Sequence, residues 1–288
     1  MLRINNLTKS FGDYVVLDKL NWQVGDGQVI GLIGSNGAGK STLLRCIASV
    51  YSVSGEISYN GEHVDLQKDK LFFVSDEPFY FNRFSTYDMK KFYRSFYSRF
   101  SEETYQRLLE VFHFDEKKPI DKLSKGLKRQ SALILGISCK PELLLMDESF
   151  DGLDPMMRLK LKREIIRLVE EEGISVIISS HNIRELEDIC DGMALLENKQ
   201  IIFTQTLEEL NHNYHKVQLG YAEAPGPELF RGQDLLFKEQ NNKVVTVIYR
   251  GSGLSEAIEA SKPILINPLP ISMEEIFVVE MESRQNEK

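Results

Sequence analysis

The stretch GSNGAGKST, Gly34–Thr42, decides the fold of this chain. It fits the pattern G-x-x-x-x-G-K-[ST], in which consecutive backbone N–H groups turn toward one phosphate group. Glycines permit that turn because they lack a Cβ, Lys40 brings a positive charge to the β- and γ-phosphates, and the Ser41 hydroxyl can bind Mg²⁺. We therefore predict a phosphate-binding Walker A loop made of Gly34, Ser35, Asn36, Gly37, Ala38, Gly39, Lys40, Ser41 and Thr42.

The residues on either side of this loop supply the context that the pattern requires. VIGLIG, Val29–Gly34, is an apolar run typical of a buried parallel strand, and residues 40–50 carry apolar side chains at helical spacing. A glycine turn that merely links two elements would not need so many constrained positions. The loop alone still leaves kinases, GTPases, helicases and motor proteins open.

Composition narrows the class of protein. The length of 288 residues suits one large domain, or a large domain with a small second one. The net charge of −8 argues against a broad nucleic-acid-binding surface. Cys46, Cys139 and Cys190 lie far apart without metal-like spacing, so we expect buried thiols in a reducing compartment. No apolar run reaches about 18 residues, which predicts a soluble, cytoplasmic polypeptide.

Alternating strand and helix patterns predict an α/β core. Strands are expected at residues 2–7, 14–24, 55–62 and 71–76, followed by a helical stretch at 86–112.

Two further apolar strands, ELLLMDES and ISVIISSH, end in polar residues, where ligands lie in open α/β sheets. A helix should follow each of them. Asp154 with Pro155 predicts the first helix start, and a capping box of Asn182 and Glu185 predicts the second.

The last part of the chain, residues 211–288, is predicted to be a small α+β domain. Its strands are expected at 215–222, 243–250 and 263–269. A closing helix should begin at Ser272, with Glu275 completing its cap.

LLLMDE, Leu143–Glu148, has the form of a Walker B strand. Four apolar residues predict burial, and two carboxylates emerge at the end. Asp147 is placed to hold Mg²⁺, and Glu148 to polarise a water molecule beside the γ-phosphate as general base. Two acids after an apolar strand are often only a solvated strand end, but the Walker A loop favours the catalytic interpretation.

Between the two motifs lies LSKGLKRQ, Leu123–Gln130, and here the sequence resembles the ATP-binding-cassette (ABC) family, whose signature is Leu-Ser-Gly-Gly-Gln. The resemblance covers about residues 2–210 and includes an aromatic residue, Walker A, Q-loop, signature, Walker B, D-loop and switch histidine in family order. It implies a P-loop NTPase core of the ABC type at 1–210, with a mostly parallel sheet, an antiparallel β subdomain and a helical subdomain. The small accessory domain at 211–288 would follow.

The resemblance also implies roles for single residues. Phe11 is similar to the aromatic residue that stacks on adenine, although Tyr14 is close enough to compete. Ser124 and Gly126 match signature positions that contact the γ-phosphate held by the other subunit. A hydroxyl and free N–H groups at a helix start suit an anion.

Two more motifs follow Walker B. DGLDP, Asp151–Pro155, resembles the D-loop, with Asp154 as its acidic member. His181 matches the switch histidine that reaches the γ-phosphate. A lone histidine would be taken as an ordinary exposed residue, but its position one strand beyond Walker B supports the functional role.

Three positions depart from the family pattern. Lys125 replaces the first signature glycine and Leu127 replaces the glutamine, which predicts altered ribose contacts in trans. Asp76 stands where the Q-loop usually has glutamine, and we expect it to meet Mg²⁺ through water. Such variants resemble exporter-like, ABC-2-related bacterial cassettes, as does the tail PISMEEIFV at 270–278.

The resemblance implies an ATPase that uses ATP and Mg²⁺. A homodimer, or a heterodimer with a sister cassette, would close around two ATP molecules and drive a transmembrane permease subunit, with export favoured. The chain would then sit on the cytoplasmic face of the membrane through that partner.

The main alternative is a soluble ABC-type ATPase acting on nucleic acid or the ribosome. Only residues 42–122 separate Walker A from the signature, without heptads, which argues against coiled-coil DNA-maintenance members, and no nucleic acid is expected as partner. A small-molecule kinase is disfavoured by the signature and by His181.

An aromatic segment at 78–100 follows the Q-loop. In the family this segment lines the groove for a coupling helix of the membrane subunit, although most rings in such a helical segment belong to the core. One helical face is expected to carry Phe92, Tyr93, Phe96, Tyr97 and Phe100. The docking contact is expected near Phe79, Tyr80, Phe81 and Phe84.

Overall fold

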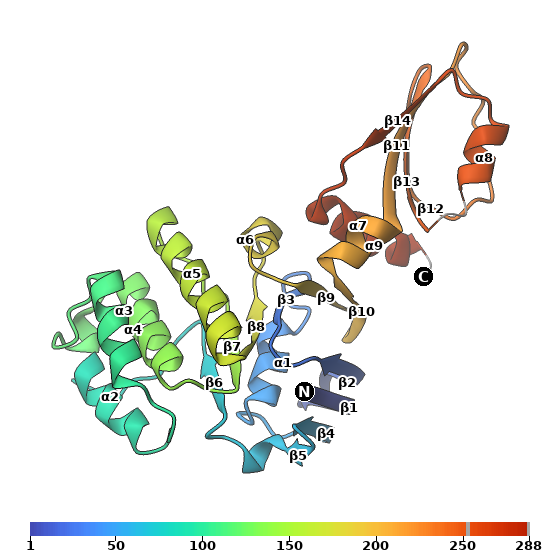
Figure 1. The fold of residues 1–288 in the computed structure, drawn as a ribbon. Coiled ribbons are helices and arrows are strands. Elements are labelled where there is room, and N and C mark those ends of the chain that lie inside the picture. Colours follow the sequence, from blue (N-terminus) through green and yellow to red (C-terminus); the bar gives the residue numbers. More distant parts are fainter. Residues whose placement is uncertain (252–253, 287–288) are drawn as a thin grey trace. The chain divides into compact units, whose positions relative to one another are not determined.

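The computed structural model describes residues 1–251 and 254–286, which belong to a first unit, Met1–Thr204, and a second that begins at Gln205 (Figure 1). Each unit encloses a hydrophobic core of its own. The division lies after residue 204, whereas the sequence prediction placed it after residue 210. It falls inside the strand β10 (Gln200–Thr206), so no loop marks it.

A mostly parallel sheet forms the centre of the first unit, with the strand order β10-β9-β3-β8-β7-β6. The strands β3, β7 and β8 are buried along their whole length, which explains why they are continuous apolar runs, as predicted. The strands besides β10 are β3 (Val29–Ile33), β6 (Leu71–Val74), β7 (Leu143–Asp147), β8 (Ser175–Ser179) and β9 (Gly192–Glu197).

The helix after the glycine loop, α1 (Lys40–Ile47), packs against both sheets of this unit. Leu43, Leu44 and Ile47 are fully buried in a core shared with apolar residues of the parallel sheet and of an antiparallel sheet. Each such side chain contributes about 1.5–3 kcal/mol, so α1 is fixed firmly. The antiparallel sheet has the order β2-β1-β4-β5, with β1 (Leu2–Phe11), β2 (Tyr14–Val24), β4 (Ser54–Tyr59) and β5 (Glu62–His63).

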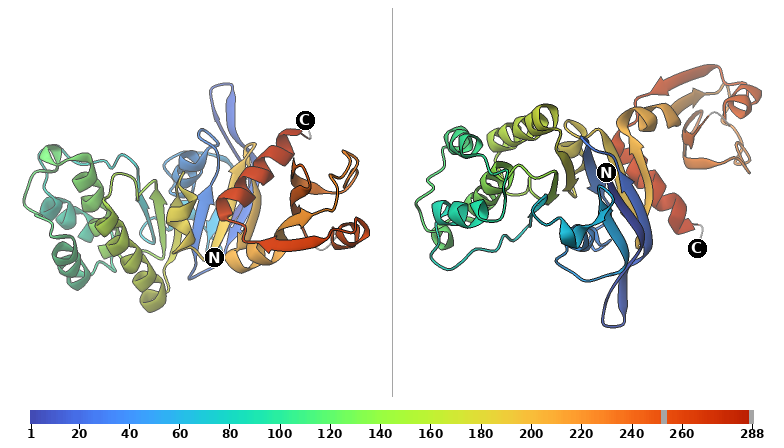
Figure 2. Two further views of the ribbon diagram at one scale, coloured as in Figure 1. Left: turned by 90° about the horizontal axis from the view of Figure 1, so that it is seen from above. Right: turned by 60° about the horizontal axis from the view of Figure 1, so that its bottom comes forward.

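A group of helices lies beside the parallel sheet, and Figure 2 shows it in cyan and green. The group consists of α2 (Thr86–Arg94), α3 (Glu102–Phe112), α4 (Lys125–Ser138) and the short 3₁₀ turn η2 (Ile120–Lys122). Residues 129–138 of α4 are all buried, so α4 is the centre of the group. A second 3₁₀ turn, η1 (Val64–Leu66), follows β5.

The helical stretch expected at 86–112 is interrupted. α2 ends at Arg94, and Ser101 begins α3 by accepting a hydrogen bond from the Thr104 N–H at 3.1 Å. The stretch predicted to be helical therefore holds two helices, and the predicted common helical face was wrong. The intervening turns carry Phe96, Tyr97 and Phe100.

The helices that follow β7 and β8 begin differently from each other. Asp154 caps α5 (Pro155–Glu172) by accepting from the Met157 N–H at 3.0 Å, which confirms that prediction. Asn182 precedes α6 (Ile183–Glu187), but within the described residues its side chain makes no capping hydrogen bond. The predicted capping box was wrong because the carboxylate of Glu185 instead binds Arg158.

The second unit contains an antiparallel sheet with the order β12-β13-β11-β14. Its predicted strands are confirmed as β11 (Tyr214–Gly220), β13 (Val244–Arg250) and β14 (Leu265–Leu269). The predicted cap of α9 (Met273–Asn286) is also confirmed, because the Glu275 N–H donates to Ser272 Oγ at 3.2 Å. The sequence prediction missed α7 (Leu207–Asn213), β12 (Leu235–Asn241) and α8 (Ser255–Ala260).

All three cysteines are buried, as expected. Burial raises the pKa of the Cys46 thiol to about 11, so this group stays protonated at neutral pH. These thiols therefore pack as small apolar groups.

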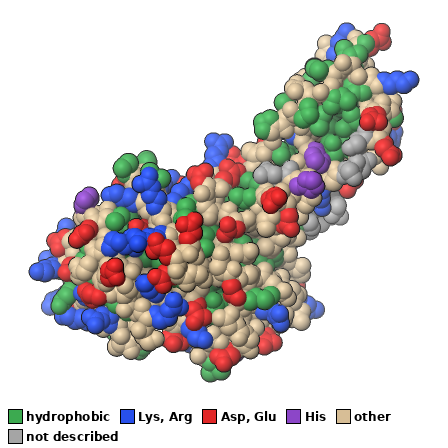
Figure 3. Space-filling view, viewed as in Figure 1, with side chains coloured by type: hydrophobic (Ala, Val, Ile, Leu, Met, Phe, Trp, Pro, Cys, Tyr) green, Lys and Arg blue, Asp and Glu red, His purple; other side chains and the backbone are tan. Residues whose placement is uncertain are grey.

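Two further features are the apolar length of the helices and the distribution of charge on the surface. Among the described residues, no helix is both long and apolar enough to cross a bilayer. Figure 3 shows Lys and Arg side chains interspersed with Asp and Glu on the face that it presents.

Candidate active site

The predicted Walker A loop connects β3 to α1. Gly39 has φ 109°, a left-handed conformation that side chains disfavour, and it directly precedes the first residue of α1. At Gly34 a Cβ would lie 2.2 Å from the Leu196 carbonyl oxygen, so only glycine fits beside β9. The loop therefore depends on glycine at these two positions for physical reasons.

Lys40 is folded back onto its own loop. Its Nζ donates to the carbonyl oxygens of Gly34 at 2.8 Å and Ser35 at 3.2 Å. Burial lowers the pKa of this ammonium, and the carboxylates of Glu148 and Asp147 oppose that shift. The positive charge is thus held inside the loop where a phosphate would lie.

Asp147 ends β7 opposite the loop. Its Oδ1 accepts hydrogen bonds from Ser41 Oγ at 2.9 Å and Ser179 Oγ at 2.7 Å, while its Oδ2 is buried without a hydrogen-bond partner in the described structure. Burial raises the pKa of this carboxyl group. A buried carboxylate oxygen that accepts no hydrogen bond in the described structure, next to a serine hydroxyl, fits Mg²⁺, which prefers oxygen ligands.

Glu148 follows Asp147 with an unusual backbone. Its φ is 47°, which is strained for a residue with a Cβ, and its N–H donates to Ser179 at the end of the neighbouring strand β8. This conformation lets the carboxylate reach His181, whose Nδ1 lies 3.0 Å from Glu148 Oε2. Asp151 Oδ2 lies 3.7 Å from the same nitrogen.

The pairing with Glu148 predicts a measurable histidine titration. The hydrogen bond to Glu148 raises the pKa of His181 above its ordinary 6.5. The stabilisation from this pairing is fully present below the unfolded-state pKa, and it is lost as the pH rises through the raised folded-state value. We expect NMR titration to give a His181 pKa above 6.5 in the wild type. The value should fall toward 6.5 in Glu148→Gln; an unchanged pKa would contradict the pairing.

Asp76, at the Q-loop position, is bound by an arginine that the sequence analysis did not single out. Arg45 Nη2 of α1 lies 2.9 Å from Asp76 Oδ1 and 3.9 Å from Asp147 Oδ2. Ser75 Oγ donates to the same Asp76 oxygen at 3.1 Å. Arg45 therefore lies between the Q-loop carboxylate and the Walker B carboxylate.

The expected adenine contact lies on the β1–β2 hairpin. The Phe11 ring packs edge-on against Tyr51, with ring centroids 5.4 Å apart, and Lys9 Nζ lies 4.9 Å above the Phe11 ring. Tyr14 pairs with Phe11 across the hairpin and is more exposed. Both rings remain accessible for stacking.

The signature and D-loop residues lie at helix starts. Ser124 is the N-cap of α4 and accepts a hydrogen bond from the Leu127 N–H at 3.3 Å. Ser124 and Lys125 are exposed, and a Cβ on Gly126 would lie only 3.1 Å from the Gly152 carbonyl oxygen. The start of α4 thus packs closely against the D-loop while its Ser124 side faces solvent.

Sequence reasoning missed several residues of this site. Glu197 ends β9 and accepts a hydrogen bond from Ser35 Oγ at 2.8 Å, so it anchors the glycine loop from the neighbouring strand. A polar residue at the end of an apolar strand was the available signal. Ser179 carried the same signal, whereas nothing in the local pattern distinguished Arg45.

Comparison with known proteins finds similarity over most of the chain. A family model described as ABC transporter matches residues 17–151. The ABC transporter ATP-binding protein YtrB of Bacillus subtilis (strain 168) is 27% identical over 285 residues, covering 96% of this chain and 97% of YtrB. The lantibiotic transport ATP-binding protein SrtF of Streptococcus pyogenes is 34% identical over 225 residues, covering 74% of this chain and 96% of SrtF.

Solved structures agree with this result. A structure of the ATP binding subunit of an ABC transporter superposes with a TM-score of 0.68 at 25% identity, over 73% of this chain and 92% of that one. The family model covers the glycine loop, Asp147 and Glu148, and the similarity to YtrB extends over nearly the whole chain. The chain therefore belongs to the family of ABC transporter ATP-binding proteins, and it is an ATPase.

Proposed function

We propose that this chain binds ATP with Mg²⁺ and hydrolyses it as one half of a dimer that powers a membrane permease in the export direction. The observation that carries the proposal is the cluster at the carboxyl ends of β7 and β8. There Ser41 and Asp147, whose Oδ2 accepts no hydrogen bond in the described structure, lie at the glycine loop, beside the pair of Glu148 and His181.

The residues of this cluster divide the work. Lys40 and the loop N–H groups bind the β- and γ-phosphates, and Ser41 with Asp147 holds Mg²⁺. When bound, this ion neutralises charge on the phosphate oxygens. Glu148 accepts the proton of the attacking water molecule, and His181 orients that carboxylate and reaches the γ-phosphate. Asp76 is proposed to contact the metal's water shell.

A second copy completes the site. Each chain carries one glycine loop and one signature, and the exposed start of α4 at Ser124 offers N–H groups and a hydroxyl to a phosphate group. Gly126 and Asp154 belong to the same proposed interface, where they would face the partner's nucleotide. ATP then joins two protomers, and hydrolysis removes the γ-phosphate that stabilises the closed state.

A role in transport is supported by the similarity to SrtF, which is described as a lantibiotic transport ATP-binding protein. We infer a place on the cytoplasmic face of the membrane, because the permease must be reached from the compartment that contains ATP. Affinity purification from membranes should recover a polytopic membrane protein. Recovery of nucleic acid or ribosomes instead would favour the alternative of a soluble ABC-type ATPase.

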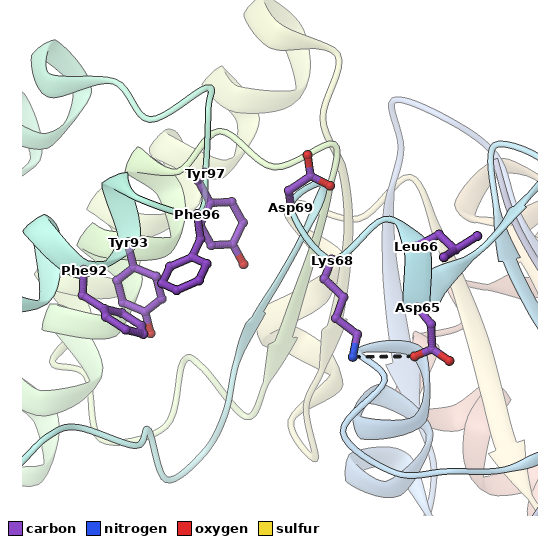
Figure 4. Close-up of a pocket in the computed structure, with 8 residues that line it drawn as sticks. All are labelled: Asp65, Leu66, Lys68, Asp69, Phe92, Tyr93, Phe96 and Tyr97. Carbon is purple, nitrogen blue, oxygen red and sulfur yellow. Dashed lines mark ion pairs between the residues drawn. The ribbon is translucent and has the colours of Figure 1, made fainter.

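The permease has a suitable docking surface in the first unit. A groove of about 480 Å³ opens between the chain after β5 and the aromatic segment around the end of α2. Figure 4 shows the rings on one side of this groove and Lys68 paired with Asp65 on the other. The groove is lined by Asp65, Leu66, Lys68, Asp69, Phe92, Tyr93, Phe96 and Tyr97.

The chemistry of this groove favours an amphipathic segment with basic residues at its edge, because two carboxylates accompany a single ammonium. Phe81 extends the aromatic surface, with its ring centroid 5.2 Å from that of Phe92. Phe79 and Phe84 are also exposed. Tyr80 does not belong to this surface, because its hydroxyl donates to the Lys128 carbonyl oxygen at 2.5 Å.

Replacing Phe96 with glutamate should release the permease. Phe96 is 59% exposed, and a buried aromatic anchor typically costs about 2 kcal/mol or more when lost, so we expect at least about a 30-fold weaker complex. The measurement is co-purification of the permease together with ATP hydrolysis by the isolated chain, which should not change. Leu159→Glu, at an exposed apolar residue of α5, is the control. Equal recovery of the permease with Phe96→Glu would contradict the docking site.

A further inference from the structure

Arg129 is a buried arginine that neither the family motifs nor the mechanism above employs. It lies on α4, five residues after the signature serine, and is only 4% exposed. Burial of a guanidinium group is costly unless its donors find acceptors, so the partners of Arg129 show what the residue does.

Those partners are backbone carbonyl groups of two nucleotide-site loops. Arg129 Nη1 donates to the Asp151 carbonyl oxygen in the D-loop, and Nη2 donates to the Asp76 carbonyl oxygen in the Q-loop at 3.2 Å. Main-chain acceptors do not depend on the side chains of those loops. The planar guanidinium can hold both carbonyls at once, which the single ammonium of lysine cannot do with the same geometry.

Each of the two carbonyl groups belongs to a residue that also contacts, directly or through Arg45, a proposed catalytic residue. The Asp151 N–H donates to the Glu148 carbonyl oxygen at 3.1 Å, so the turn that Arg129 holds begins at the proposed general base. The Asp76 side chain in turn accepts from Arg45 on α1, which also approaches Asp147. Both loops are thereby connected to one point on the signature helix.

The close approach of α4 and the D-loop is an independent observation. The position of a Cβ on Gly126 lies 3.1 Å from the Gly152 carbonyl oxygen, next to the turn that Arg129 binds. The first turns of α4 therefore contact the D-loop at two places, through a glycine and through the guanidinium group.

We propose that Arg129 is a positioning residue that fastens the Q-loop and the D-loop of one protomer to its signature helix. The inference rests on the proposed composite site. It means that the segments facing the protomer's own nucleotide and those facing the partner's nucleotide move as one body. Replacing the Arg129 guanidinium group should therefore increase the mobility of both loops.

The test compares Arg129→Lys with Arg107→Lys in the full-length chain without nucleotide. Arg107 binds Glu164 Oε2 at 2.5 Å between α3 and α5, so the control makes the same arginine-to-lysine substitution at a site away from the two loops. We expect hydrogen exchange at residues 75–78 and 150–154 to be at least about tenfold faster in Arg129→Lys and unchanged in the control. Faster exchange in only one loop, or in neither, would overturn the proposal.

Kinetics add a second readout. ATP turnover of Arg129→Lys should fall about tenfold or more with an unchanged KM, because misplacement of a catalytic group affects kcat. A rise in KM with an unchanged kcat would contradict a positioning role for Arg129. Since exchange is measured without nucleotide, failure of the proposed dimer leaves that readout intact.

Should Arg129→Lys not fold, the neutral Arg129→Gln replaces it. Failure of both to fold beside a folded control would assign Arg129 to core stability and overturn the proposal.

Discussion

Glu148→Gln is expected to stop ATP turnover while ATP binding persists. Glutamine keeps the size of the side chain but cannot accept the proton of the attacking water molecule, so turnover should fall by about 10²–10⁴-fold. The γ-phosphate then stays in place and should hold the dimer closed. Gel filtration with ATP and Mg²⁺, together with a phosphate-release assay, measures both effects.

A matched control lies at the other end of the same strand. Glu142 precedes β7 and accepts a hydrogen bond from Asn60, remote from the glycine loop. Glu142→Gln should therefore hydrolyse ATP at the wild-type rate and should not accumulate as a dimer. Near-normal turnover by Glu148→Gln would remove Glu148 from the role of general base.

Two inactive variants should restore each other when mixed. Lys40→Ala removes the phosphate-binding charge of one protomer, and Ser124→Arg blocks the signature of the other with a bulky side chain. A dimer made of either variant alone contains no complete site. A mixed dimer contains one intact site, made of Lys40 from the second variant and Ser124 from the first. Activity well above the sum of the separate variants is the expected result of an ATPase titration.

The mixing ratio sharpens this experiment. Activity should peak near equimolar amounts and should fall on dilution, because the intact site exists only in the mixed dimer. If no ratio restores hydrolysis although both variants are folded, the site is not shared between protomers. If either variant alone retains full activity, its residue plays no part in the reaction.

Most strands of the catalytic core followed from local sequence, whereas β9 and β10 were not predicted. The runs that became β3, β7 and β8 are apolar because they are buried on both faces. β3 leads into the glycine loop, whereas β7 and β8 end in the polar residues Asp147 and Ser179. The break between α2 and α3 escaped notice although Ser101 with two following glutamates is a helix-start signal. The many aromatic residues of that stretch concealed it by their helical spacing.

The contacts between distant segments were beyond local reasoning. Arg45 and Asp76 are 31 positions apart in the sequence, and the residues around either one do not predict their contact. Glu185 matched a capping pattern, but burial beside Arg158 gave its carboxylate a charged partner, which binds more strongly than a backbone N–H at a helix start. Such choices depend on which elements the fold brings together.

The hydrogen bonds that Lys40 makes to its own loop have a consequence for how quickly ATP is captured. The two carbonyl groups already occupy the ammonium, so an arriving anion exchanges acceptors instead of organising a mobile side chain. The entropy of ordering Lys40 has been lost during folding, before any encounter with ligand. Association of ATP should consequently be limited by diffusion, with little delay from rearrangement of the Lys40 side chain.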